Sequence, residues 1–161
     1  MDASETNLKL TFREMGHEDL DVVVQNETRS YAYPWSREIF ADCLRSGYDC
    51  RIATYEHSIV GHSVLSAAAG ESHLLNVCIK RDQQGKGLGR ILVQHMLHRA
   101  RILGADVLFL EVRPTNLVAQ RLYASLGFRE IGVHENYYPS SAGREDARVL
   151  ALDLGDLDVA D

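Results

Sequence analysis

The chain has 161 residues, 45% of them hydrophobic, which is enough apolar material for one domain with a single core. Its formal net charge of −6 argues against the basic surface that general nucleic-acid binding requires, and it suits a basic peptide or amine as a partner. Three cysteines without paired spacing predict neither a disulfide framework nor a metal site, and because no signal peptide or membrane span is recognisable we expect a cytoplasmic monomer.

The first third of the chain predicts a strand followed by two helices. Residues 8–12 alternate between apolar and polar, as in a half-buried strand, and residues 17–31 have the spacing of an amphipathic helix. Ser36 is placed to cap a second helix, which ends at Gly47. Trp35, the only tryptophan, either packs over the start of that helix or forms one wall of a substrate groove.

Three strands are predicted next, over 48–55, 59–68 and 71–80, and the last leads into a glycine-rich turn. The turn reads Gln84-Gly85-Lys86-Gly87-Leu88-Gly89-Arg90. Because glycine adopts positive φ and has no Cβ, successive backbone N–H groups can point into one concavity beside a helix N-terminus. Such a concavity binds phosphate. The alternative is an ordinary glycine-rich turn that begins a helix.

The remaining elements alternate between helices and strands and end in an acidic tail. They are a helix over 89–103, a strand over 106–112, a helix that Thr115 could cap and that ends at Gly127, strands over 128–134 and 146–154 on either side of a polar segment, 136–145, and a tail over 155–161. We expect 1–154 to form a single domain and the tail to be disordered.

Taken together, the order β-α-α-β-β-β-α-β-α-β-β and the positions of Gln84, Gly87 and Gly89 resemble the GCN5-related N-acetyltransferases. Within that family, the stretches most similar to the bacterial ribosomal-protein-alanine N-acetyltransferases are 33–36, 111–116, 122–128, 136–139 and 143–147. The resemblance implies an α/β (α+β) acyltransferase fold, with a mixed, mostly antiparallel sheet of about seven strands and four flanking helices.

The same resemblance implies an activity. An enzyme of this kind moves the acetyl group of acetyl-CoA to the N-terminal alanine of a small-subunit ribosomal protein, by direct attack in a ternary complex. The alternatives are an enzyme of the same fold that acetylates lysine side chains or a small amine, and a non-catalytic acetyl-CoA sensor. The presence of both Glu111 and Tyr123 argues against the sensor.

Glu111 and Tyr123 are, by this resemblance, the general base and the general acid. The residues themselves agree, because a carboxylate at the end of an otherwise apolar strand is shielded from water and becomes more basic, and a phenol suits protonation of an alkyl thiolate. Two structural alternatives stay open. Glu111 could instead pair with Arg113 or Arg121, and Tyr123 could be a buried tyrosine bonded to a backbone carbonyl.

The binding residues are implied by the resemblance as well. Those expected to bind acetyl-CoA are Val77, Cys78, Ile79, Gln84, Gly85, Lys86, Gly87, Leu88, Gly89, Arg90 and Asn116. Those expected to shape the peptide site are Trp35, Tyr137, Tyr138 and Arg144.

Overall fold

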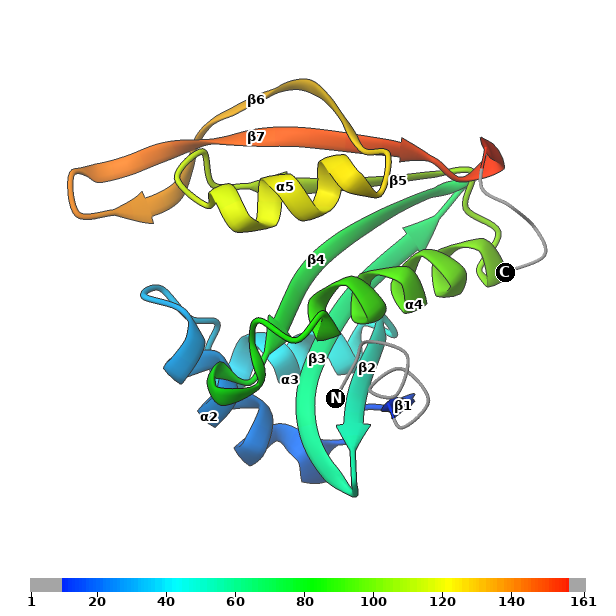
Figure 1. Cartoon of the computed structure of the whole chain (residues 1–161), viewed down its shortest axis with the longest axis vertical. Coiled ribbons are helices and arrows are strands. Elements are labelled where there is room, and N and C mark those ends of the chain that lie inside the picture. The colour runs from blue at the N-terminus through cyan, green and yellow to red at the C-terminus, as the bar shows by residue number, and fades with distance from the viewer. Residues whose placement is uncertain (1–9, 157–161) are drawn as a thin grey trace. The chain divides into compact units, whose positions relative to one another are not determined.

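A computed structural model of the protein describes residues 10–156, which contain seven strands and four α-helices (Figure 1). The elements are β1 (Leu10–Glu14), α2 (Leu20–Ser30), α3 (Arg37–Arg45), β2 (Asp49–Tyr55), β3 (Ser58–Ala68), β4 (Glu71–Ile79), α4 (Leu88–Ile102), β5 (Val107–Val112), α5 (Leu117–Ser125), β6 (Arg129–Ser140) and β7 (Gly143–Asp153), with short 3₁₀ turns at His17–Asp19 (η1), Arg81–Gln83 (η2) and Leu154–Asp156 (η3). This order confirms the predicted sequence of elements.

The strands pair in the order β1-β2-β3-β4-β5-β7-β6. The pairing of β4 with β5 is parallel, whereas β1 with β2, β2 with β3, β5 with β7 and β6 with β7 pair antiparallel. The predicted mixed and mostly antiparallel sheet with four helices is therefore confirmed. In residues 10–156 no helix is long and apolar enough to cross a membrane.

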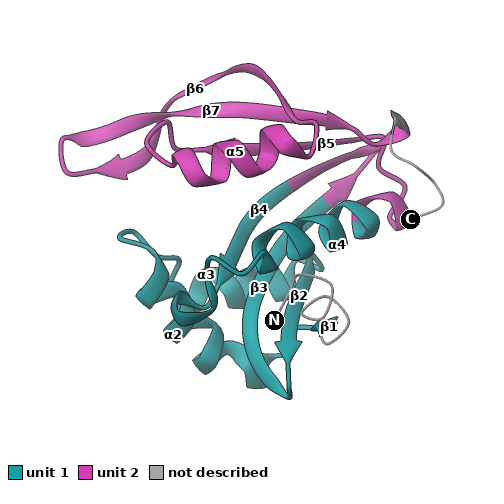
Figure 2. Cartoon of the chain, in the orientation of Figure 1, with its two compact units in different colours: residues 1–66, 74–99 teal, residues 67–73, 100–161 magenta. Residues whose placement is uncertain are grey.

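The chain divides into two compact units, which Figure 2 distinguishes by colour. The first unit runs to Ser66 and includes Leu74–Arg99, and the second consists of Ala67–His73 and the residues from Ala100 onward. Strand β4 therefore begins in the second unit and ends in the first. Of the expected disordered tail, residues 155 and 156 belong to η3, and 157–161 lie outside the described residues.

In the first unit, different helices cover the two faces of the sheet. On one face, Phe12 of β1 stacks on the His95 ring of α4, with ring centroids 3.9 Å apart. On the other face, Phe40 of α3 meets the ring of His62 edge-on at 5.3 Å. The second contact belongs to a cluster of buried residues from α2, α3 and the sheet: Met15, Leu20, Val23, Phe40, Cys43, Cys50, Ile52 and Val64.

Several predicted helix boundaries are confirmed and one is wrong. The Ser36 hydroxyl accepts a hydrogen bond from the Ile39 backbone N–H at 3.2 Å, and Gly47 and Gly127 follow their helices with φ of +76° and +100°. Helix α5, however, is capped by Asn116, whose side-chain oxygen accepts from the Ala119 N–H at 3.1 Å. Thr115 and Asn116 are both good capping residues, and only the backbone geometry selects between them.

The two C-terminal strands are longer than predicted. The polar segment 136–145 was expected between the strands, but β6 reaches Ser140 and β7 starts at Gly143. The partners Tyr138 with Glu145, and Pro139 with Arg144, continue the ladder through that segment. Polar side chains are compatible with this arrangement because β6 is an edge strand with exposed residues along most of its length.

Candidate active site

The glycine-rich turn of the first unit has the backbone conformation that only glycine adopts easily. Gly85 and Gly87 have φ of +79° and +82°, and a Cβ added at either position would meet no atom within 4 Å. Gly89 differs, because it lies inside α4 and has no positive φ. Of the three glycines, Gly85 and Gly87 therefore provide left-handed backbone.

The turn leads directly into the N-terminus of α4. The Ile91 N–H donates to the Gly87 carbonyl at 3.4 Å, which starts the helical ladder. The N–H groups of the first turn have no acceptor within a helix and carry its positive dipole end. Together with the ammonium of Lys86, which donates to the Gln83 side chain at 3.1 Å, this end of the helix is chemically suited to an anionic group such as a pyrophosphate.

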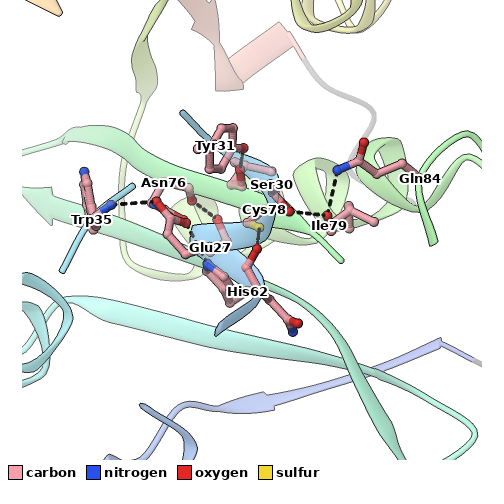
Figure 3. Close-up of polar contacts among 12 residues, drawn as sticks. Glu27, Ser30, Tyr31, Trp35, His62, Asn76, Cys78, Ile79 and Gln84 are labelled. Atoms are coloured by element: carbon pink, nitrogen blue, oxygen red, sulfur yellow. Dashed lines mark hydrogen bonds and ion pairs between the residues drawn. The ribbon is translucent and has the colours of Figure 1, made fainter. Parts of the chain in front are cut away.

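Gln84 joins the turn to the end of β4 through its side chain. Its Nε2 donates to the Ile79 carbonyl at 2.9 Å, and the Ser30 hydroxyl donates to the same oxygen at 3.3 Å (Figure 3). The Tyr31 hydroxyl donates to the Val77 carbonyl. The side chain of Gln84 thus fixes the position of the turn, so the turn would meet a phosphate through its backbone rather than through this amide.

Cys78 points into the protein between Val77 and Ile79. Its side chain is 1% exposed, and its Sγ lies 3.8 Å from the Asn26 carbonyl, to which the thiol donates. Burial raises the pKa of the Cys78 thiol to about 12. The thiol is therefore neutral and inert, and at this position only the backbone is available to a ligand.

The structure favours a packing role for Trp35. Its ring lies 5.2 Å from the Phe40 ring, and the side chain packs against the buried cluster of the first unit. Its backbone N–H donates at 3.1 Å to Oε2 of Glu27 (Figure 3). These contacts fix the start of α3.

Glu27, which the sequence analysis did not single out, is a buried carboxylate with a side chain only 3% exposed. Its Oε1 lies 3.0 Å from Nε2 of His62, and the Asn76 amide donates to both carboxylate oxygens at 3.2 Å. A signal was present in the sequence. Leu20, Val23 and Glu27 share one face of the predicted helix, so a charge continues an apolar stripe there.

Glu111 lies at the end of β5 in the second unit. Leu108, Leu110 and Val112 are buried, whereas Val107, Phe109 and Glu111 occupy the other, half-buried face. The Glu111 side chain itself is only 10% exposed. A hydrogen bond joins its Oε2 to Nε2 of His73, and its Oε1 lies 3.9 Å from Nδ1 of His134.

The sequence analysis proposed Arg113 as a possible structural partner of Glu111 and did not consider the two histidines. Arg113 donates to Glu145 at 2.8 Å and to the Pro139 carbonyl at 2.9 Å. His73 could not be recognised from the sequence, because it precedes Glu111 by 38 residues and only the parallel pairing of β4 with β5 brings them together.

Tyr123 is buried on α5, with 9% exposure, and its ring meets the Phe128 ring edge-on at 5.4 Å. Burial raises the pKa of Tyr123 to about 12. The phenol therefore carries its proton at neutral pH, which is the state that a general acid requires. Packing against Phe128 holds the ring in one orientation.

Tyr137 and Tyr138 bring aromatic surface close to Glu111. Their rings meet edge-on at 4.8 Å, and the guanidinium of Arg113 lies 4.3 Å from the centre of the Tyr138 ring. Burial and, secondarily, the negative charge of Glu111 raise the pKa of Tyr137. Arg144 is directed elsewhere: its Nε donates to the Asn136 carbonyl at 3.2 Å, across the β6–β7 hairpin.

Comparisons with known proteins agree with one another. A family model described as "Acetyltransferase (GNAT) family" matches residues 17–128. The [ribosomal protein bS18]-alanine N-acetyltransferase of Escherichia coli (strain K12) is 36% identical over 136 residues, which are 84% of this chain and 92% of that protein.

Solved structures give the same result. The crystal structure of the ribosomal-protein-S18-alanine N-acetyltransferase from Escherichia coli matches with a TM-score of 0.84 and 33% identity, over 93% of this chain and 97% of that one. Ard1 from Thermoplasma volcanium matches with a TM-score of 0.80 and 24% identity, over 90% of this chain and 97% of that one, and supports the fold alone.

Proposed function

Because this chain belongs to the acetyltransferase (GNAT) family, we propose that it transfers the acetyl group of acetyl-CoA to the N-terminal alanine of the ribosomal protein bS18. The observation that carries this proposal is the 36% identity to the E. coli enzyme named for that reaction, over 92% of its length. The net charge of −6 supports it, since an acidic protein attracts a basic peptide. We propose a cytoplasmic monomer that uses no metal.

In the first unit, the N–H groups of the turn and of the first turn of α4 bind the pyrophosphate of acetyl-CoA. Gly85 and Gly87 allow the backbone to face the phosphates without a side chain in the way. The backbone of Val77 and Ile79 runs beside the pantetheine arm. In the second unit, the Asn116 amide nitrogen is available to donate to acetyl-CoA, because its cap uses only the oxygen.

In the second unit, the chemistry belongs to Glu111 and Tyr123. Glu111 removes a proton from the α-ammonium, directly or through a water, and the neutral nitrogen attacks the thioester carbonyl. As the carbon–sulfur bond breaks, Tyr123 gives its proton to the departing thiolate. An α-amine has a pKa near 8 and a lysine near 10.4, so an N-terminus costs less to deprotonate at neutral pH.

Aromatic side chains close to Glu111 suit an extended peptide. Tyr137 and Tyr138 present two rings at a steep angle, which can clamp a peptide backbone while its first residue reaches the base. Arg144 supports this site by bracing the hairpin that carries the tyrosines, and in the first unit Trp35 fixes the start of α3.

The test is a panel of short peptides assayed with acetyl-CoA and analysed by mass spectrometry. A peptide that starts Ala-Arg is expected to be the best substrate, and peptides with other first residues are the comparison. The matched control is the same peptide with a blocked N-terminus and an added lysine. Equal acetylation of the blocked peptide would contradict the N-terminal assignment and favour a lysine acetyltransferase.

Glu111→Gln tests the base in the same assay. This substitution keeps the shape and a hydrogen bond but removes the basic oxygen, so the loss of kcat/KM should be greatest where the amine is protonated and should shrink as pH rises. A wild-type profile of kcat/KM against pH in Glu111→Gln would remove Glu111 from the role of base.

A further inference from the structure

His73 and Glu111 are neighbours through the register of β4 and β5. The parallel strands place Glu71 beside Val107 and His73 beside Phe109, so Glu111 is two residues beyond Phe109 on the same face of β5. A side chain can reach such a diagonal neighbour. The hydrogen bond between Nε2 of His73 and Oε2 of Glu111 is made in this way.

The two oxygens of Glu111 have different surroundings. Oε2 is bonded to His73, whereas Oε1 lies 3.9 Å from Nδ1 of His134, which is longer than a hydrogen bond. The His134 side chain is 53% exposed and the His73 side chain 33%. One oxygen is thus held by a fixed partner, and the other is open to a proton donor.

We propose that His73 is a positioning residue for acetyl transfer, and that it directs Oε1 of Glu111 toward the substrate amine by holding Oε2. The proposal rests on the proposed function, in which Glu111 is the base. An ionised carboxylate only accepts hydrogen bonds, so the bonded tautomer of His73 carries its hydrogen on Nε2. The bond restricts rotation of the carboxylate.

Other groups around Glu111 do not replace this bond. Tyr137 and Tyr138 lie on β6, and the charge of Glu111 contributes to raising the pKa of each phenol, after burial. Both phenols therefore stay protonated and neutral. His134 approaches from the same strand at 3.9 Å, and Arg113 is paired with Glu145. Among these groups, only His73 makes a hydrogen bond to the carboxylate.

The first test is steady-state kinetics with an Ala-Arg peptide. His73→Ala should lower kcat about tenfold, because a hydrogen bond to a charged group is lost. The KM for acetyl-CoA should not change. His73→Phe, which fills the same space without a donor, should behave like His73→Ala.

Two matched variants sharpen this result. His73→Gln restores an N–H donor that does not titrate and should stay within about threefold of wild type. His134→Ala removes the more distant and more exposed imidazole and should change kcat by less than about twofold. A wild-type kcat in His73→Ala, or an equal loss in His134→Ala, would overturn the proposal.

A double variant separates His73 from the base itself. If His73 acts through Glu111, then adding His73→Ala to Glu111→Gln should lower kcat by less than about twofold more. A full additional tenfold loss would show that His73 acts by itself and would overturn the positioning role, while N-terminal acetylation would stand.

An NMR measurement tests the contact without any activity. In wild type, the Nε2–H of His73 should give a slowly exchanging proton resonance, and Glu111→Ala should remove it. Absence of this resonance in wild type, or its persistence in Glu111→Ala, would overturn the proposal. If the resonance behaves as expected but no peptide is acetylated, the proposed function fails and the contact between His73 and Glu111 stands.

Discussion

The two units each bury a glutamate against a histidine, and the two pairs differ in how completely the carboxylate is bonded. In the first unit, both oxygens of Glu27 are occupied, by His62 and Asn76 at Oε1 and by Asn76 and the Trp35 N–H at Oε2. In the second unit, Oε2 of Glu111 is bonded and Oε1 is not within hydrogen-bonding distance of His134. The same pair of residue types therefore supports structure in one unit and, in the proposed function, chemistry in the other.

The units also differ in what they would offer to ligands. The first unit presents backbone groups, at Gly85, Gly87 and the end of β4, while the nearby side chains of Gln84 and Cys78 are turned toward the protein. The second unit presents side chains around Glu111. Substitutions in the first unit should therefore change stability or coenzyme affinity, and those in the second unit should change kcat.

The largest effect is expected from Glu27→Ala. The change leaves His62, Asn76 and the Trp35 N–H without their acceptor inside the protein, which should lower the free energy of unfolding by about 3–5 kcal/mol. Urea unfolding measures it. The control is Glu38→Ala on the exposed side of α3, expected within about 0.5 kcal/mol of wild type. A loss below about 1 kcal/mol in Glu27→Ala would show that the hydrogen bonds of Glu27 contribute little to the free energy of unfolding.

The next effect is expected from Tyr123→Phe in the second unit. It should lower kcat by about 100-fold or more with little change in coenzyme affinity, because the proton for the thiolate is lost and the ring packing against Phe128 is kept. Steady-state kinetics and calorimetry with acetyl-CoA measure the two quantities. Tyr48→Phe, at an exposed tyrosine, is the control. A kcat within about threefold of wild type would make the acid role of Tyr123 untenable.

A smaller effect is expected from Gly87→Val in the first unit. A Cβ would enter open space beside the backbone N–H groups, so acetyl-CoA affinity should fall about tenfold, with kcat at saturation less affected. Calorimetry measures the affinity. Gly47→Val is a matched control, since Gly47 has a similar φ of +76° and equally open surroundings but lies outside the turn. Equal loss of affinity in both variants would mean that backbone strain alone is responsible.

The smallest effect concerns the pH dependence of stability in the first unit. Arg13 donates to both oxygens of Asp19 at 2.8 Å, and these hydrogen bonds lower the pKa of Asp19. A lowered carboxyl pKa stabilises the fold above the unfolded value of about 3.9, and the contribution is lost as pH falls through the folded value. Arg13→Gln should therefore lower the urea midpoint at pH 7, and the difference from wild type should shrink below about pH 4.

The exposed pair Arg37 and Asp21 provides the comparison for that prediction. Their side chains are 55% and 88% exposed, so solvent screens the pair and Arg37→Gln should change the midpoint little at any pH. A difference between Arg13→Gln and wild type that stays constant down to pH 3 would show that Arg13 acts through packing rather than through Asp19.

Much of the fold was predictable because its signals are local. The apolar periods of α2 and β5, the Ser36 cap and the glycine after α3 each depend on residues within a few positions of one another. The turn over 84–90 was recognisable for the same reason, since glycine spacing reports backbone conformation directly. Glu111 was recognisable as a charge that interrupts an apolar strand.

Only the tertiary structure decided the features that depend on distant partners. The polar segment 136–145 joins a long hairpin because β7 supplies hydrogen-bonding partners to it, and polar composition alone predicts a loop. His62 lies 35 residues from Glu27, and His73 lies 38 residues from Glu111. A hydrogen bond across such a separation depends on strand register and helix packing, so no pattern within a short window of sequence distinguishes the carboxylate that is fully bonded from the one with an open oxygen.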